Sequence, residues 1–280
     1  MADLRIGTSA FSDKGWVGTF YPKGTQPGEF LSHYASRFKT VELDTTYYAI
    51  PPASTVEGWN RKTPADFVFS AKMPQVITHE KVLVDCDSEL REFLDVMSKL
   101  GGKLGPLVLQ FGYFNRAAFR SQKEFLARLE PFLEKLPEGF RFAVEIRNQE
   151  WVDPRLLDAL RRRNVGFVLT DQSRMLRPWE YPPDLDFLTS DFTYIRLLGD
   201  RKAIEAVTQT WNKVVMDREE ELRLWVKLID AIRRRLRHLF LYANNHYQGY
   251  SPATVEKVLS LLTGEAPGPP APSDDQLRLF

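Results

Sequence analysis

Short apolar runs rich in β-branched and aromatic residues recur eight times along this chain of 280 residues. Runs of this kind are typical of parallel strands that are buried on both faces. Their starts are 24 to 46 residues apart, which leaves room for a helix in each gap. The runs cover residues 4–8, 40–44, 67–71, 107–111, 142–146, 166–170, 193–197 and 239–243.

Helical patterns fill most of the gaps between these runs. Apolar residues recur at helical spacing from Leu90 to Leu100, from Phe125 to Leu133 and from Leu222 to Leu236. A pair of residues typical of a helix start, Asp153-Pro154, opens a further helix at about 154–163. The pattern is weakest after the sixth run, where prolines at 178, 182 and 183 interrupt it.

Eight strand–helix units predict the α/β class and a single (β/α)8 TIM-type barrel over residues 1–262. A doubly wound sheet is the alternative, but it calls for a glycine-rich phosphate turn after an early strand. The sequence has no such turn, since Gly101-Gly102 follows a helical pattern and is typical of a helix end.

Composition narrows the class of protein further. Hydrophobic residues make up 43% and charged residues 27% of the chain, and the net charge is +1, which excludes a disordered or fibrous chain. The balance also argues against coating nucleic acid by bulk charge. The single cysteine, Cys86, cannot form an intramolecular disulfide. With neither a secretory signal nor a membrane-spanning run, we expect a cytoplasmic protein with no membrane partner.

Polar side chains gather at the carboxyl ends of the predicted strands, where the active sites of such barrels lie. Charges within buried strands are costly unless a partner or a ligand neutralises them. A salt-bridge network at the barrel mouth is one explanation, and a ligand pocket is the one we favour. The predicted catalytic residues are Glu42, His79, Glu145 and Asp171. The predicted substrate-binding residues are Lys72, Arg147, Arg196, Gln110, Tyr48, Trp151, Asn244 and Asn245.

The same segments resemble a known family. The matching segments include Ile6 to Ser9, Val41 to Asp44, Ile77 to His79, Glu145 to Arg147, Tyr194 to Arg196 and Asn244-Asn245. Over residues 4–262 they are similar to the domain-of-unknown-function 72, or YecE-like, family. The resemblance implies a TIM-type barrel and no established activity. The chain differs from the usual pattern at Ala10-Phe11 and at Leu198, where a histidine is common. The change at Leu198 argues against a metal or acid–base role for the seventh strand.

Three chemistries fit the predicted mouth. In outline the barrel resembles endonuclease IV-type repair barrels, which suggests hydrolysis assisted by a divalent metal. The available ligands for one oxygen-rich site are His79, His246, Glu42, Asp44, Glu145 and Asp171. Alternatively, Glu42 and Glu145 could act as the paired carboxylates of a glycosidase. The third chemistry is anion binding, in which the mouth cations would hold a phosphate or carboxylate.

Two runs of three arginines, residues 161–163 and 233–235, lie near predicted helix ends. Cations at a helix C-terminus complement the helix dipole. These runs would also lie on the barrel face opposite the active site. We therefore interpret them as solvated helix ends rather than as a surface that binds nucleic acid.

The composition changes after the barrel. Residues 263–275 are rich in proline and predict a disordered tether. The tether leads to Gln276, Leu277, Arg278, Leu279 and Phe280, a peptide that resembles the bacterial sliding-clamp-binding motif. The resemblance implies that Gln276, Leu277, Leu279 and Phe280 bind the clamp. The alternative is that the apolar side chains fold back onto the barrel.

Together these observations predict an enzyme that acts on a phosphate-containing substrate. DNA is the expected substrate, and a sliding clamp is the partner that would bring a repair-type hydrolase to it. A non-catalytic barrel that binds a ligand or DNA is the first alternative. A carbohydrate hydrolase with paired carboxylates is the second, and it would leave the C-terminal peptide unexplained.

Overall fold

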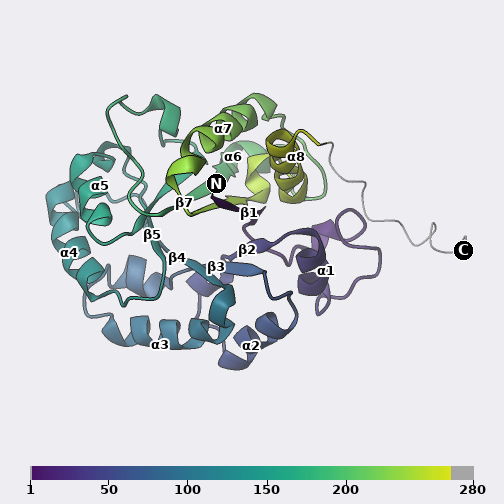
Figure 1. Ribbon diagram of the computed structural model, residues 1–280, viewed down its shortest axis with the longest axis horizontal. Coiled ribbons are helices and arrows are strands. Elements are labelled where there is room, and N and C mark those ends of the chain that lie inside the picture. Colours follow the sequence, from purple (N-terminus) through teal and green to yellow (C-terminus); the bar gives the residue numbers. More distant parts are fainter. Residues whose placement is uncertain (1, 266–280) are drawn as a thin grey trace, which may run out of the picture.

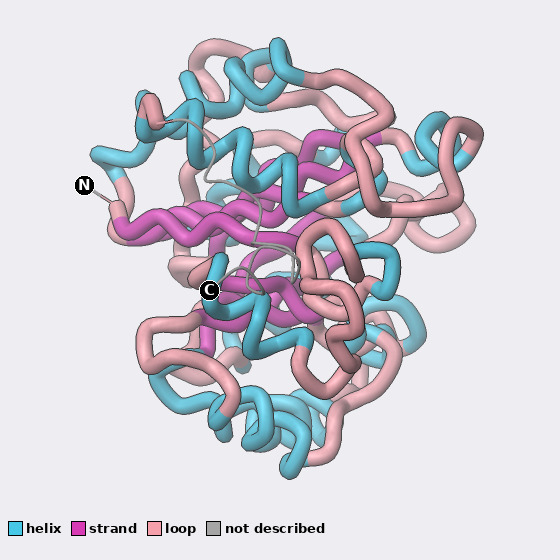
Figure 2. The backbone as a smooth tube through the Cα atoms, turned by 90° about the vertical axis from the view of Figure 1, so that its right-hand side faces the viewer, coloured by secondary structure: helices cyan, strands magenta, loops and turns pink. Residues whose placement is uncertain are grey.

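Eight parallel strands close into one barrel in the computed structural model, which describes residues 2–265. Each strand pairs with the next along the chain, and β8 pairs with β1. The strands occupy the centre of the molecule and the helices surround them (Figures 1 and 2). The strands are β1 (Asp3–Thr8), β2 (Thr40–Leu43), β3 (Val68–Lys72), β4 (Leu104–Gln110), β5 (Phe142–Glu145), β6 (Gly166–Gln172), β7 (Phe192–Gly199) and β8 (His238–Ala243). The predicted TIM-type barrel is thereby confirmed.

Helices follow the strands in seven of the eight units. They are α1 (Phe30–Arg37), α2 (Ala53–Arg61), α3 (Asp87–Met97), α4 (Gln122–Lys135), α5 (Pro154–Arg161), α6 (Arg201–Glu205), α7 (Glu219–Ile232) and α8 (Ser251–Thr263). The gap between β6 and β7 differs, because its one helical turn is the 3₁₀ segment Pro178–Glu180. Proline lacks a backbone N–H and its ring blocks a continuing helix, which accounts for the missing α-helix.

The barrel has two apolar layers. The larger one lies between the strands and the helices. The smaller one fills the barrel interior and consists of Val108, Ala143, Val168, Phe192, Tyr194, Phe240 and Tyr242. These residues occupy alternate positions of their strands, since successive side chains of a strand point to opposite faces. Continuing the alternation toward the strand ends turns Glu42, Glu145 and Arg196 into the interior.

The predicted C-terminal segments lie at or beyond the end of the described chain. Helix α8 continues to Thr263, one residue past the predicted end of the barrel, and Gly264 ends it with a φ of 74°. The remainder of the predicted tether and the peptide 276–280 lie outside the described residues. Within residues 2–265, no helix combines the length and the apolar character needed to cross a membrane.

Candidate functional site at the barrel mouth

Hydrogen bonds across the barrel interior define the mouth. Strands β2 and β7 are not neighbours in the sheet, yet Glu42 of β2 contacts both Tyr194 and Arg196 of β7. Such contacts can only run through the interior. Register places Gln110 beside Glu145 and Arg196 beside Thr170, and the hydrogen bond from Arg196 to Glu145 joins these strands in one polar layer.

Arg196 is the centre of this layer. Its Nη2 donates to Glu42 Oε1 at 2.7 Å and to Asp44 Oδ1 at 3.2 Å. Its Nη1 donates to Glu145 Oε2 at 2.8 Å. The Arg196 side chain is 1% exposed, and both glutamates are fully buried. Burial disfavours the guanidinium ion, but the carboxylates of Glu42 and Glu145 outweigh it and raise the pKa of Arg196 well above its usual value.

The outer part of the network reaches toward solvent. Arg147 forms an ion pair with Glu145, and Lys72 Nζ lies 3.3 Å from Asp44 Oδ1. Burial opposes ionisation of Glu145, yet the Arg147 and Arg196 guanidiniums lower its pKa below the ordinary value. The buried Nε of Arg147 has no hydrogen-bond partner among the described residues. The Arg147 side chain is also partly exposed, at 21%.

His79 lies at the edge of the same mouth. It belongs to a π-helical turn, Val76–Glu80, and π-helical segments occur often at functional sites. Its Nδ1 is 2.8 Å from the hydroxyl of Thr78, and its ring meets Tyr47 edge to face. Burial, followed by the nearby charges of Lys72 and Arg147, lowers the pKa of His79 below 6.5. The imidazole is therefore mainly neutral at pH 7.

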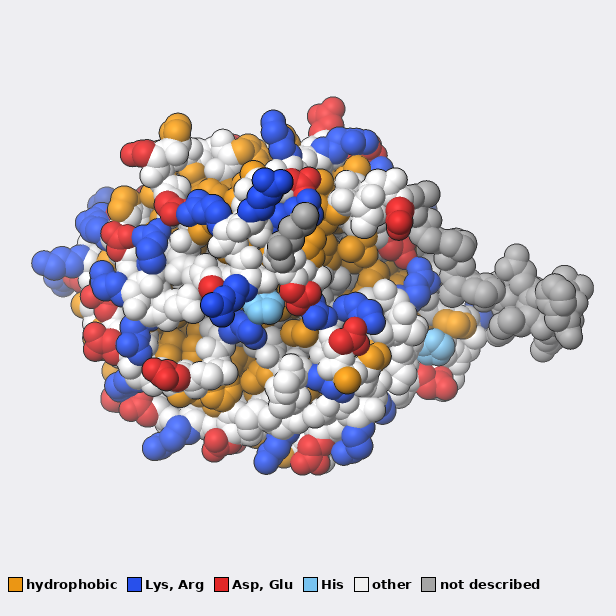
Figure 3. All heavy atoms as spheres, viewed as in Figure 1, with side chains coloured by type: hydrophobic (Ala, Val, Ile, Leu, Met, Phe, Trp, Pro, Cys, Tyr) orange, Lys and Arg blue, Asp and Glu red, His pale blue; other side chains and the backbone are white. Residues whose placement is uncertain are grey.

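A cleft of about 700 Å³ opens beside Arg147. Loops after β4, β5, β6 and β7 form its walls. Its basic lining residues are Arg147, Arg174, Arg201 and Lys202, and its acidic ones are Glu150 and Asp200. Figure 3, by contrast, shows basic and acidic side chains intermixed over one face of the molecule. The cleft therefore concentrates positive charge on a protein with a net charge of +1.

Several residues of this cleft are not among the predicted site residues. Arg174 follows β6 by two positions, and Arg201 and Lys202 follow β7 by two and three. Tyr113, which is 69% exposed, lies three residues after β4 and also lines the cleft. The signal was present, because barrel loops carry functional residues beyond the strand ends. The predicted set includes loop residues after several strands, such as Tyr48 and Trp151, but none from the loops after β4, β6 and β7 that line the cleft.

Comparison with known proteins places the barrel in a family. A family model described as "Protein of unknown function DUF72" matches residues 5–276. The chain belongs to the DUF72 family. The resemblance noted in the sequence is thereby confirmed.

Individual relatives and a solved structure agree with this family membership. YecE of Escherichia coli strain K12 is 34% identical over 157 residues, which are 54% of this chain and about half, 56%, of YecE. YunF of Bacillus subtilis strain 168 is 25% identical over 287 residues, covering 95% of this chain and 96% of YunF. The crystal structure of a DUF72 family protein from Thermotoga maritima has 27% identity and a TM-score of 0.71, covering 93% of this chain and 98% of that one.

Asp171 lies on the outer face of this DUF72 barrel rather than in the mouth. Its Oδ2 accepts hydrogen bonds from Trp225 Nε1 of α7 at 2.8 Å and from the Tyr247 hydroxyl at 3.0 Å. Its Oδ1 is 3.2 Å from Arg177 Nη2. Strand alternation explains the position, because the neighbouring Gln172 lines the cleft. Asp171 thus ties the loop after β6 to α7.

Trp151 is also turned away from solvent. It is 6% exposed, and its ring stacks on those of Phe114 and Phe125 at 6.1 and 5.3 Å between centroids. These contacts fill the layer between α4 and the barrel. Tyr48, by contrast, is 72% exposed and meets Tyr47 edge to face at 5.1 Å. Of the two aromatic residues predicted to bind substrate, only Tyr48 presents its ring to solvent.

The predicted amide groups have partners within the DUF72 chain. Asn244 Oδ1 accepts from the backbone N–H of His246, and Asn245 Nδ2 donates to Asp13 Oδ2 at 2.7 Å. Gln110 Nε2 donates to the carbonyl of Phe111 at 2.9 Å, although Gln110 remains partly exposed at the mouth. The two asparagines therefore shape the loop after β8, and Gln110 keeps its side-chain oxygen available.

The expected divalent metal does not match the donor groups that the mouth offers. Among the described residues, no group of three or more His, Cys, Asp or Glu side chains is placed to hold a metal ion. The oxygens of Glu42 and Glu145 already bind the guanidinium of Arg196. A metal ion would have to compete with that cation for the same lone pairs, so the mouth carboxylates do not fit a divalent metal ion.

Proposed function

We propose that this DUF72 protein binds the phosphate group of a phosphate-containing substrate in the cleft beside Arg147. Arg147 carries the proposal, because it lines the cleft and its side chain remains 21% exposed there. A phosphate oxygen in the cleft could accept a charge-assisted hydrogen bond from the exposed part of this side chain. Arg174 and Lys202 form no ion pair with described residues and would supply further positive charge.

Arg196 has a different role in this proposal. Its guanidinium is 1% exposed and donates to Glu42, Glu145 and Asp44, so we assign it no direct contact with the ligand. It instead fixes Glu145, which in turn fixes Arg147. Arg196 is thus a positioning residue that acts on the ligand through two intervening side chains.

The reaction we propose is hydrolysis of a phosphoester. Neutral His79 would take a proton from water as the water oxygen attacks phosphorus, and it would return that proton to the oxygen of the breaking P–O ester bond. Its lowered pKa supports the role of a base near neutral pH. Lys72, whose charge contributes to that pKa, would stabilise the negative charge on the phosphoryl oxygens.

The paired carboxylates support this assignment better than a glycosidase. A retaining or inverting glycosidase needs one carboxylic acid that protonates the leaving group. Glu145 is held as the anion by two guanidiniums, which lower its pKa. Glu42 accepts hydrogen bonds from Tyr194 at 2.6 Å and from Arg196 at 2.7 Å. We therefore assign both glutamates to positioning the mouth cations.

We propose DNA as the substrate and a sliding clamp as the partner that brings the barrel to it. The support is the sequence of residues 276–280, which lies outside the described residues. Tethering would raise the local concentration of DNA at the mouth, which the net charge of +1 does not do by itself.

Binding and turnover test the proposed site separately. Calorimetric titration with a single-stranded oligonucleotide and with inorganic phosphate should show affinity about tenfold weaker for Arg147→Ala. Arg234→Ala, which removes a distant arginine, should bind like the unaltered protein. His79→Gln should bind the oligonucleotide normally and hydrolyse bis(p-nitrophenyl) phosphate more slowly. Equal affinities of the two arginine variants would refute the phosphate site, and unchanged turnover of His79→Gln would refute its catalytic role.

A pull-down with purified bacterial sliding clamp tests the partner. The full chain should be retained, and a double variant with Leu279→Ala and Phe280→Ala should be lost. Arg278→Ala is the matched control, because the motif allows any residue at that position. Retention of the double variant would exclude the peptide as the binding element.

A further inference from the structure

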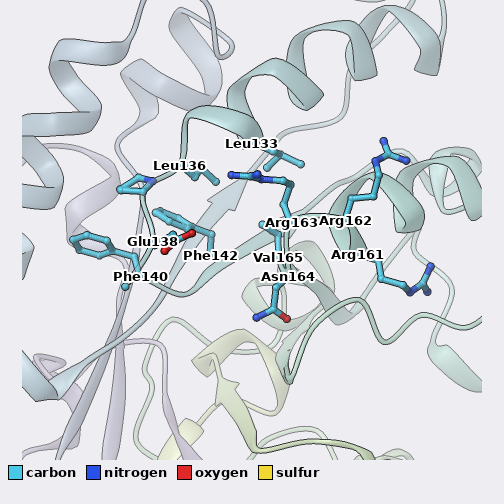
Figure 4. A pocket seen from close by; sticks show the side chains of 12 residues that line it. Leu133, Leu136, Glu138, Phe140, Phe142, Arg161, Arg162, Arg163, Asn164 and Val165 are labelled. Atoms are coloured by element: carbon cyan, nitrogen blue, oxygen red, sulfur yellow. The ribbon is translucent and has the colours of Figure 1, made fainter.

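A second cavity lies at the opposite end of the barrel. Its volume is about 400 Å³. It is bordered by the end of α4, by the loop at 136–141 that leads into β5, and by the segment 161–165 that leads from α5 into β6 (Figure 4). These segments precede the strands β5 and β6, whereas the mouth cleft follows them. The cavity is thus separate from the site of the proposed function.

The floor of this cavity is apolar. Leu133, Phe142 and Val165 line it and are almost fully buried, while Phe140 lies half-buried at its edge. Gly139, with a φ of 88°, makes a tight turn between Glu138 and Phe140. A ligand with an apolar side chain would remove the exposed part of Phe140 from water.

Three arginines border the cavity, but they are not equivalent. Arg161 forms an ion pair with Asp158, and Arg162 Nη2 lies 3.1 Å from Glu130. Figure 4 shows both side chains pointing away from the cavity. Arg163 instead extends from the end of α5 toward Leu133 and Leu136. Arg163 Nη2 donates to the carbonyl oxygen of Glu134 at 3.3 Å. Within residues 2–265, Arg163 forms no ion pair.

An acidic group completes the lining. Glu138 lies on the loop before β5, across the cavity from α5, and within the described chain it forms neither an ion pair nor a side-chain hydrogen bond. Arg163 and Glu138 do not pair with each other. The cavity therefore presents one cation and one anion, both without a charged partner in residues 2–265, around an apolar floor.

We propose that this cavity binds a free apolar α-amino acid. Such a molecule carries a carboxylate, an ammonium group and an apolar side chain on one carbon atom. Its carboxylate would accept two parallel hydrogen bonds from the planar guanidinium of Arg163. Its ammonium group would donate to Glu138, and its side chain would pack against Phe140 at the edge of the apolar floor. The cavity volume lies at the low end of the range of small-molecule sites, which suits a ligand of this size.

Three probes separate the contributions of the two charges. L-phenylalanine carries both charges, N-acetyl-L-phenylalanine carries only the carboxylate, and L-phenylalaninamide carries only the ammonium group. Titration of the full chain, followed by calorimetry or by amide chemical shifts, should show saturable binding of L-phenylalanine. Each of the other two should bind about tenfold more weakly or worse, since each loses one charge-assisted contact.

Variants of the two charged residues complete the test. Arg163→Ala and Glu138→Gln should each weaken L-phenylalanine binding about tenfold or more, and Arg163→Lys should restore part of the loss. Both residues are exposed, so thermal unfolding should show that these variants remain folded. Arg162→Ala, which removes an arginine that points away, should leave the affinity unchanged. Absence of saturable binding, or binding that survives Arg163→Ala, would overturn the proposal.

Discussion

Arg196 and Glu42 join two strands that are not neighbours, β7 and β2, by a hydrogen bond of 2.7 Å across the barrel interior. Both side chains are almost completely buried. Removing one partner from a buried ion pair leaves the other charge unpaired in a medium of low polarity. The pair therefore couples the stability of the barrel to the geometry of its mouth.

Replacing Arg196 by methionine should strongly destabilise the protein. Glu42 and Glu145 would both lose a cationic partner, and a loss of about 3–5 kcal/mol in the free energy of unfolding follows from such cases. Urea unfolding monitored by circular dichroism measures it. Arg223→Met, an exposed residue in a surface pair with Glu219, should change the stability by less than about 1 kcal/mol. A similar small change for Arg196→Met would show that the buried pair adds no net stability.

The pKa of His79 should be measurably below 6.5. Burial is the main cause, and the charges of Lys72 and Arg147 act in the same direction. A nuclear magnetic resonance titration of the ring, assigned with His79→Gln, gives the midpoint. Lys72→Met should raise that midpoint because it removes a repelling cation. A midpoint at or above 6.5 in the unaltered protein would contradict the burial of His79 beside Lys72 and Arg147.

The same histidine should make stability depend on pH. In the unfolded chain it binds a proton near pH 6.5, while in the folded protein it does so only at lower pH. The contribution of neutral His79 to the free energy of unfolding is therefore fully retained above pH 6.5. It is lost as the pH falls through the pKa that the residue has in the folded protein. Unfolding free energies of the unaltered protein and of His79→Gln should converge in that acidic range and differ most above it. A constant difference across the range would show that His79 does not cause the dependence.

Asp171→Asn should reduce stability rather than alter the chemistry of the cleft. The buried carboxylate accepts from Trp225 and Tyr247 and pairs with Arg177, so the change leaves three donors poorly satisfied. We expect a loss of about 2–4 kcal/mol. Asp230→Asn, on the exposed side of α7, should cost less than about 0.5 kcal/mol. Lost turnover at unchanged thermal stability would instead indicate that Asp171 acts in catalysis.

The barrel could be predicted because each buried strand has a recognisable pattern in the local sequence. Buried parallel strands need continuous apolar runs, and each of the eight runs overlaps one observed strand. It is harder to predict from sequence which alternate residues of a strand face the barrel interior and which face the helices. Glu145 and Asp171 are both charged residues near strand ends, yet one faces the interior and the other faces α7. Strand pairing and barrel closure decide which side chains face the interior, and the residues of a single run specify neither of them.

Burial of aromatic residues shows the same limit. Trp151 and Tyr48 both follow a strand end by a few residues, but Trp151 packs on Phe125 and Tyr48 is exposed. The difference depends on which helix covers each loop. Likewise, the run at 161–163 predicts a solvated helix end, and Arg161 and Arg162 form ion pairs at that surface. Only the three-dimensional structure shows that Arg163 turns the other way, over an apolar floor.

Gly199→Ala should disrupt the end of β7 next to the mouth cleft. The residue has a φ of 69°, a conformation that is costly for alanine, and an added Cβ would lie 2.5 Å from the carbonyl oxygen of His246. We expect a loss of at least about 2 kcal/mol in unfolding free energy. Gly102→Ala is the control, because no heavy atom lies within 4 Å of its added Cβ, and it should change stability by less than about 0.5 kcal/mol. Equal stabilities of the two variants would mean that the chain around His246 can shift to admit a methyl group.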